Sequence, residues 1–270
     1  MRQKCRSAKT RTTSRQRRLA ELQPYVDWAR GIKGWTIGVE LIDLGPRPPC
    51  GYVDRAKVLL AGARTVLDMG TVSWARGFLS CSKDTTGSRS QLRDGRETST
   101  VASQELSTYG APVAYASGLS LPFADACFDL VLNRHNELTP ADVARVLSPG
   151  GSFLTQQVGH YNWQELRAFF LRQTDLGPKF DRYQKEFLAA GLAIERAETH
   201  DTPVACRSLG DLVYLLTATL WTVPGFDLEA DLDTLLALEQ ALYKDDHIAL
   251  TNSRYIIEVH KAAPIGALQP

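Results

Sequence analysis

The sequence predicts an α/β fold built on a doubly wound, mostly parallel β-sheet. Apolar runs with strand character alternate along the chain with segments of helical periodicity. The segments between successive strands are long enough to cross over the sheet, as parallel pairing requires. No internal repeat interrupts this order. We therefore expect one α/β domain rather than an array of small units.

Composition and charge limit the possible functions of the chain. The 270 residues are 44% hydrophobic and 23% charged, so the chain is long and apolar enough to bury a core without disulfides. A formal net charge of +1 argues against capture of nucleic acid by the whole surface, and we expect no nucleic-acid partner. No window approaches the roughly 18 apolar residues of a membrane helix, so we expect no membrane partner and a cytoplasmic, intracellular protein.

The first 18 residues carry a local excess of positive charge. Eight basic residues precede the first acid, Glu21, in a stretch rich in Ser, Thr and Gln: Arg2, Lys4, Arg6, Lys9, Arg11, Arg15, Arg17 and Arg18. We expect residues 1–18 to be a disordered tail and residues 19–270 to form the domain, with a helical extension at its start. The composition fits a solvated tail, an organelle transit peptide or a nuclear or RNA-binding arm.

The cysteines and histidines give no metal-binding pattern. No pair of cysteines has C-x-x-C spacing, and no two histidines have the i, i+4 spacing of a helical metal site. We therefore predict no metal and expect reduced thiols at Cys5, Cys50, Cys81, Cys127 and Cys206.

Periodicity and turn residues predict the elements in order. Expected helices are 18–32, 53–63, 101–106, 140–147, 162–170, 180–190, 211–220 and 231–243. Expected strands are 64–69, 112–116, 128–133, 152–158, 192–197 and 254–260. The polar stretch between the first two strands has no clear pattern, and the place of a further strand within it stays open. In open parallel sheets ligands bind beyond the carboxyl ends of the strands, so we expect the site at 68–71, 117–120 and 133–135.

Three groups of residues follow one another in a recognisable order. They are Val66-Leu67-Asp68-Met69-Gly70-Thr71, then Leu121-Pro122-Phe123 with Phe128-Asp129-Leu130-Val131, then Arg145-Val146-Leu147 before Pro149-Gly150-Gly151. This ordered set resembles the class I S-adenosylmethionine-dependent methyltransferases. The likeness covers 53–158 by motif and the rest by element order. It implies a seven-stranded Rossmann-like sheet with S-adenosyl-L-methionine as cofactor.

The resemblance implies a role for the residues at the end of the first strand. Asp68, Met69, Gly70 and Thr71 would bind the methionine part of the cofactor, since glycine lets the backbone approach closely. An acid at the end of the second strand would bind the ribose hydroxyls. Glu97 is the first candidate for that acid, ahead of Asp94 and Asp84.

Further candidates lie after the later strands. The resemblance places Ser117, Gly118 and Leu119 at the adenine, with a hydroxyl where relatives commonly have Asp. Asn133 would face cofactor and substrate. His135 is the candidate general base, although in-line methyl transfer in a dry pocket need not have an obligatory base.

The chain departs from the family directly after Gly70. Bulky Val72 and Trp74 stand where small residues usually admit the cofactor. The leading hypothesis is methyl transfer to a small-molecule oxygen, nitrogen or carbon nucleophile. A catalytically inactive binding or scaffolding protein with this fold is the first alternative, and an RNA methyltransferase guided by the basic tail is the second. The oligomeric state stays open.

Overall fold

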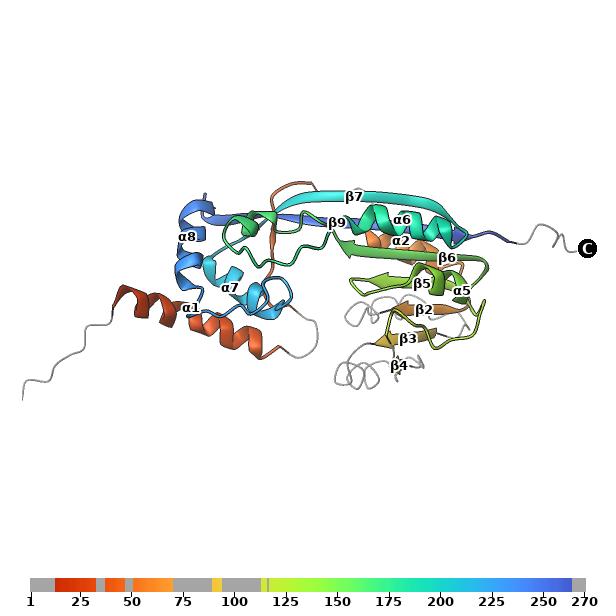
Figure 1. Cartoon of the computed structure of the whole chain (residues 1–270), viewed down its shortest axis with the longest axis horizontal. Helices are drawn as coiled ribbons and strands as arrows, with labels where there is room; N and C mark the ends of the chain where they lie inside the picture. Colours follow the sequence, from red (N-terminus) through yellow and green to blue (C-terminus); the bar gives the residue numbers. More distant parts are fainter. Residues whose placement is uncertain are drawn as a thin grey trace, which may run out of the picture.

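The chain folds into two lobes joined by two long strands (Figure 1). The computed structural model describes residues 13–32, 37–46, 51–69, 89–93, 113–115 and 117–263. The larger lobe holds a twisted sheet with helices on both faces, and the smaller lobe is mainly helical. Strands β7 (Leu192–Cys206) and β9 (His247–Lys261), each 15 residues long, run through both lobes.

Seven strands form the main sheet in the order β4-β3-β2-β5-β6-β9-β7. The remaining strands are β2 (Val66–Met69), β3 (Arg89–Arg93), β4 (Val113–Tyr115), β5 (Phe128–Arg134) and β6 (Leu147–Val158). Strands β2 to β6 pair in parallel, whereas β9 is antiparallel to both β6 and β7. The parallel part has the strand order of a doubly wound fold. The predicted fold class is therefore confirmed.

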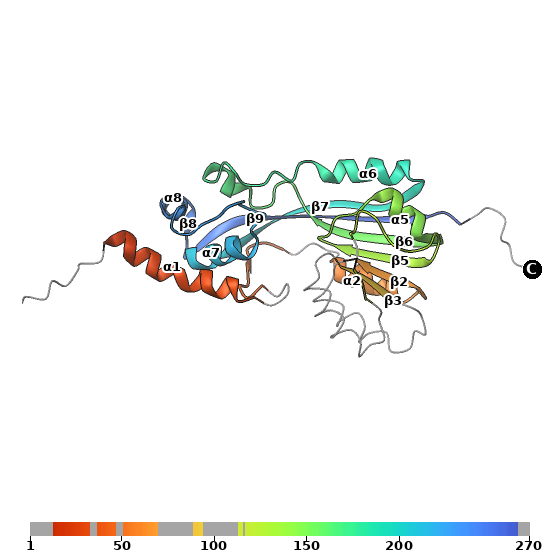
Figure 2. The ribbon, with the colours of Figure 1, turned by 60° about the horizontal axis from the view of Figure 1, so that its bottom comes forward.

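Helices cover both faces of this sheet (Figure 2). Helix α2 (Tyr52–Leu60) packs on one face, and α5 (Pro140–Val146) and α6 (Lys179–Ala189) pack on the other. The side chains of β5 alternate between the two buried clusters: Leu130 and Leu132 face α2, while Val131 faces α5 and α6. This alternation is why the central strands read as continuous apolar runs in the sequence.

A charged pair fastens α2 to the sheet. The guanidinium of Arg55 donates two hydrogen bonds to the carboxylate of Glu258 of β9, at 2.7 Å from Nε and 2.5 Å from Nη2. Glu258 is only 3% exposed. A buried carboxylate needs such a partner, so this contact fixes where α2 sits on its face of the sheet.

The smaller lobe has a hydrophobic core of its own. Helix α1 (Ser14–Arg30) packs against α7 (Leu209–Ala218), with α8 (Leu232–Leu242) and the 3-10 helix η2 (Gln164–Ala168) around them. The short strand β1 (Ile42–Asp43) pairs with β7, and β8 (Tyr243–Lys244) pairs with β9. In the described part of the chain, no helix is long and apolar enough to cross a membrane.

Helix α1 corrects the expected length of the basic tail. It begins at Ser14, so residues 14–18 are helical rather than disordered. Thr13 accepts a hydrogen bond from the backbone of Gln16, and the Gln16 side chain accepts one from the backbone of Thr13. This capping box satisfies two backbone donors that would otherwise lack partners. Residues 1–12 lie outside the described residues.

Two further expectations need correction. The predicted helix 162–170 contains only the five-residue 3-10 helix η2, because Trp163 has a left-handed backbone and its N–H donates to Thr251 of β9. The strand expected at 152–158 also begins earlier, since β6 starts at Leu147 and includes Gly150 and Gly151, with a shift of register against β5. The predicted helix 101–106 lies outside the described residues.

Candidate functional site

The strand order of the sheet reverses between β2 and β5. From β2 the chain builds outward through β3 and β4, and from β5 it builds in the opposite direction through β6. Met69 and Asn133 are register partners at the carboxyl ends of these strands, and Asp68 pairs with Leu132 one residue earlier. Asp68 is 8% exposed and Asn133 is fully buried. The predicted site residues on these two strands are therefore neighbours at the expected place.

Asn133 is the centre of a buried polar network. Its Oδ1 accepts hydrogen bonds from the Thr155 hydroxyl at 2.9 Å and from Gln157 Nε2 at 2.6 Å. Gln157 also donates to the backbone carbonyl of Asn136, at 2.9 Å. The Asn133 amide nitrogen lies 4.0 Å from Met69 Sδ. The network holds the Asn133 side chain in one orientation beside the end of β2.

A tight turn at 117–120 closes over the end of β2. Gly118 is buried there, and a Cβ at this position would collide with the carbonyl oxygen of Glu137 and lie 3.3 Å from Met69 Cε. The turn is also tied to the loop after β5, because Thr139 Oγ1 donates to the Leu119 carbonyl at 2.9 Å. The hydroxyl of Ser117 accepts from the Leu119 N–H at 3.1 Å. Only a residue without a side chain fits this approach.

Two of the sequence motifs meet in space through Arg145. Its guanidinium donates to the carbonyls of Leu121 and Phe123, at 2.8 and 2.6 Å, and is held by Asp142 at 2.7 Å. Asp142 also accepts the backbone N–H of Leu121. The Leu-Pro-Phe segment is thus fastened to α5, which explains why its position after the 117–120 turn is fixed.

His135 follows β5 with a left-handed backbone, at a φ of 58°. Its N–H donates to the Gln156 carbonyl at 2.9 Å, and part of its side chain contacts water. Desolvation by the surrounding protein and then the charges of Arg254 and Arg134 lower its pKa to about 3. The imidazole is therefore neutral at physiological pH and a weak base. Its role as a general base stays a prediction.

Some predicted site residues lie outside the described part of the chain. Gly70, Thr71 and Glu97 are among them, as are the bulky Val72 and Trp74. Strand β3, which the sequence did not reveal, ends at Arg93. Asp94 is thus the first residue after the second parallel strand, three positions before the favoured candidate Glu97.

The sequence did not single out Thr155, Asn136 or Arg145 as parts of the site. Thr155 and Gln157 lie two residues apart on β6 and so share a face, which is the signal that could have grouped them. Most of the large aromatic residues after β6 belong to the hydrophobic core. Trp163, Phe170, Tyr183 and Phe187 are buried, although Trp221 is 51% exposed.

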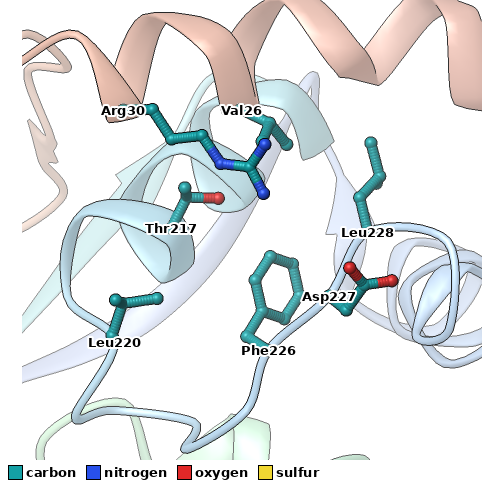
Figure 3. Close-up of a pocket in the computed structure, with 7 residues that line it drawn as sticks. All are labelled: Val26, Arg30, Thr217, Leu220, Phe226, Asp227 and Leu228. Carbon is teal, nitrogen blue, oxygen red and sulfur yellow. The ribbon is translucent and has the colours of Figure 1, made fainter.

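A separate cavity of about 160 Å³ lies in the smaller lobe (Figure 3). Its wall is apolar on α1, α7 and the segment before α8, and the guanidinium of Arg30 reaches into it. The lining residues are Val26, Arg30, Thr217, Leu220, Phe226, Asp227 and Leu228. None of the predicted site residues lines it, so it is distinct from the reversal point of the sheet.

Comparison with known proteins identifies the fold. No family model matches the sequence, and no curated protein matches it. Among solved structures, a candidate methyltransferase from Bacillus halodurans C-125 shares 14% identity, with a TM-score of 0.56 over 78% of this chain and 99% of that one. The YcgJ protein of Bacillus subtilis gives 18% identity and a TM-score of 0.56, over 78% of this chain and 98% of that one.

A third structure covers more of the chain. A functionally unknown protein from Deinococcus radiodurans R1 gives 15% identity and a TM-score of 0.58, over 88% of this chain and 99% of that one. At these identities the likeness concerns the fold alone. The strand order, the two helical layers and the structural neighbours agree, and the chain has the class I methyltransferase fold.

Proposed function

We propose that the chain is an S-adenosylmethionine-dependent methyltransferase that acts on an oxygen, nitrogen or carbon nucleophile of a small molecule. The observation that supports this most is the grouping at the strand-order reversal. There Asp68, Asn133 and the turn at 117–119 meet at the carboxyl edge of the sheet. The fold is one that a candidate methyltransferase shares.

The described residues suit such a cofactor. Asp68 offers a buried carboxylate at the end of β2, and the Asn133 side chain is held rigidly beside it. The close approach of Gly118 to Glu137 leaves Ser117 and Leu119 exposed on the outside of the turn, where a flat base could pack. We assign Asp68 to the methionine part of the cofactor and Ser117, Gly118 and Leu119 to the adenine, with Asn133 facing both cofactor and substrate.

S-adenosylmethionine supplies an electrophilic methyl group on a sulfonium. The contribution of the chain is then to align the nucleophile with that methyl group and to exclude water. Asn133 is suited to orient a polar acceptor, since its side chain cannot rotate without breaking two hydrogen bonds. The neutral imidazole of His135 is suited to donate or accept a hydrogen bond rather than to carry a charge.

Calorimetric titration with S-adenosylmethionine tests the proposal. We expect saturable binding to the full-length chain, weakened about tenfold or more by Asp68→Asn, because a charged hydrogen-bond acceptor is lost. Asp54→Asn, at an exposed position on α2, is the matched control and should bind like the parent chain. If a folded, monodisperse sample gives no saturation at about millimolar cofactor, a concentration far above ordinary cofactor affinity, the proposal is wrong.

That negative outcome would favour the alternative of a catalytically inactive binding or scaffolding protein. The feature behind this alternative is the presence of Val72 and Trp74 directly after the first strand. In that case replacing both by glycine should create cofactor binding that the parent chain lacks, since small residues leave room for the ligand.

The RNA methyltransferase alternative depends on the basic tail. Two of its eight basic residues are engaged within the smaller lobe: Arg15 donates to the Glu229 carbonyl at 2.7 Å, and Arg18 pairs with Glu21 and Glu239. Deleting residues 1–12 removes five of the other six early basic residues, all except Arg17, without cutting into α1. If RNA affinity and its salt dependence do not change on this deletion, the tail is not an RNA-binding arm.

A further inference from the structure

Three nitrogen-rich side chains gather at the carboxyl edge of the sheet, beside the candidate cofactor site. Arg134 ends β5 directly after Asn133, and His135 follows it. Arg254 lies on β9 opposite Val158, the last residue of β6. By alternation along the strands, Arg134 and Arg254 share the α2 face with Leu132 and Ile256. The guanidinium of Arg134 stacks over the Tyr52 ring of α2, 5.7 Å from its centroid.

The charge of Arg254 is not balanced by a carboxylate. Its Nη1 donates to the side-chain oxygen of Asn162 and to the carbonyl of Ser253, both at 2.6 Å and both neutral. Within the described residues it makes no ion pair. These two bonds orient the guanidinium and leave its positive charge without a counter-ion.

The acids on the same face of β7 and β9 are already bound by other side chains. Glu198, level with Ile256, is bound by Arg196 at 3.4 Å and by His200 at 3.2 Å. Glu258 is bound by Arg55. Neither of these two carboxylates on the Arg254 face is therefore left for Arg254, although Glu198 lies two residues from its register partner His200 and Glu258 lies four residues from Arg254.

This arrangement lowers the pKa of two of its members. Desolvation, and then the charge of Arg134, lowers the pKa of Arg254 to about 10. The same two arginines contribute to the low pKa of His135. Burying the charge of Arg254 costs free energy unless an anion joins it, and buried charges of this kind are commonly found at binding sites.

We propose that Arg254 and Arg134 bind an oxyanion group, a carboxylate or a phosphate, of the methyl acceptor. The guanidinium fork matches the geometry of both groups. Both residues are partly exposed, and because Nε and Nη1 of Arg134 are buried, a ligand would reach that guanidinium at Nη2. Arg134 follows the end of β5, which pairs with the end of β2, so an acceptor anchored here would lie on the α2 face at the same edge of the sheet as the candidate cofactor site. This inference rests on the proposed function for the identity of the ligand as an acceptor.

Anion titrations followed by NMR at the arginine side-chain Nε–H signals test this inference. The probes are inorganic phosphate and malonate, each added to the full-length chain with and without S-adenosylhomocysteine. We expect saturable shifts of the Arg254 signal, with dissociation constants raised about tenfold or more by Arg254→Gln. Arg254→Lys keeps the charge but loses the fork, so its affinity should be intermediate. Tighter binding of phosphate or of malonate identifies the class of anion.

Arg64→Gln is the matched control. It removes the same charge at the amino end of β2, where the Arg64 side chain is 90% exposed, and should leave anion binding unchanged. If Arg254→Gln does not fold, Arg134→Gln tests the same site from a different strand. The inference is wrong if neither anion saturates the parent chain, or if folded Arg254→Gln or Arg134→Gln binds both anions as the parent does. Anion binding without S-adenosylhomocysteine binding contradicts the proposed function alone, and the reverse result contradicts this inference alone.

Discussion

The side-chain nitrogen of Gln157 donates to Oδ1 of Asn133 at 2.6 Å and so links the end of β6 to the end of β5. The acceptor is fully buried, and Thr155 is its other donor. Replacing Gln157 by Leu removes three hydrogen bonds from this network. Asn133 then keeps one of its two donors, next to a bulky apolar group.

We expect Gln157→Leu to lower the free energy of unfolding by about 1–3 kcal/mol, because buried polar groups lose partners. Urea denaturation measures this change. Gln156→Leu is the control, since Gln156 is the neighbouring residue on the opposite face of the same strand. Equal losses for the two variants would show that the network does not contribute specifically.

Gly118 gives a prediction about the turn over β2. A methyl group there would collide with the Glu137 carbonyl and push the turn away from Met69. We expect Gly118→Ala to destabilise the protein by about 1–3 kcal/mol, as in other overpacked sites, and to weaken binding of S-adenosylmethionine. Thermal unfolding and calorimetry measure the two effects. Gly62→Ala, where the nearest atom is 4.0 Å away, should change neither.

The low pKa of His135 leads to a prediction of how the free energy of unfolding depends on pH. Its pKa is about 3 in the folded state, below its ordinary value of 6.5, so folding favours the neutral form. The stability that this contributes is complete above pH 6.5 and is lost as the pH falls from 6.5 toward 3, because the unfolded chain takes up the proton first. Replacing His135 by Asn, which tolerates the left-handed backbone, should reduce the loss of stability between pH 7 and pH 5.

Urea denaturation at the two pH values measures this difference. His247→Asn, at the start of β9, controls for the loss of a histidine as such. The prediction is wrong if His135→Asn and the parent chain lose the same stability on acidification.

The end of β3 gives a prediction about the ribose contact. Since β3 ends at Arg93, Asp94 follows the strand more closely than Glu97 does. In dinucleotide-binding folds of this kind an acidic side chain binds the ribose hydroxyls. We therefore expect Asp94→Asn to weaken binding of S-adenosylmethionine about tenfold or more and Glu97→Gln to have a smaller effect. Calorimetry on both variants decides which acid contacts the ribose. A larger loss of binding for Glu97→Gln than for Asp94→Asn would assign the contact to Glu97.

The central strands were predictable because their burial leaves a simple pattern. Leu130, Val131 and Leu132 form an uninterrupted apolar run in β5, and β2 ends where the sequence turns to glycine. Helix α6 was predictable from its amphipathic spacing and from Gly191, which adopts the expected left-handed backbone at φ 79°. In each case local chemistry and tertiary burial favour the same structure.

Other elements depend on contacts that no local pattern reveals. Strand β3, with the sequence Arg-Ser-Gln-Leu-Arg, forms between β2 and β4 without an apolar run. The segment at 162–170 does bury Trp163, Leu166 and Phe170, as its periodicity indicated. Its backbone instead follows β9, because Glu165 binds the N–H and hydroxyl of Thr251, at 3.0 and 2.6 Å.

The same reasoning explains which part of the candidate site was predictable. Asp68, Met69 and Asn133 follow apolar strands in the sequence and were found from that position. Arg254 was not predicted as a site residue, because it lies on β9. This strand is antiparallel to β6, so its carboxyl end points away from the edge of the sheet that holds the candidate site. The predicted end of β7 at Ala197 was also too early. The strand continues to Cys206, and the carbonyl of Pro203 accepts the N–H of Leu44 beside β1.

The path of β7 and β9 has a consequence for how the protein can be taken apart. The chain enters the smaller lobe along β7, builds α7 and α8, and returns along β9, while α1 joins the same lobe from the start of the chain. A single proteolytic cut therefore cannot release either lobe whole, because at least one of the two fragments still contributes to both cores. Nicked protein should migrate as one particle until a denaturant separates the pieces.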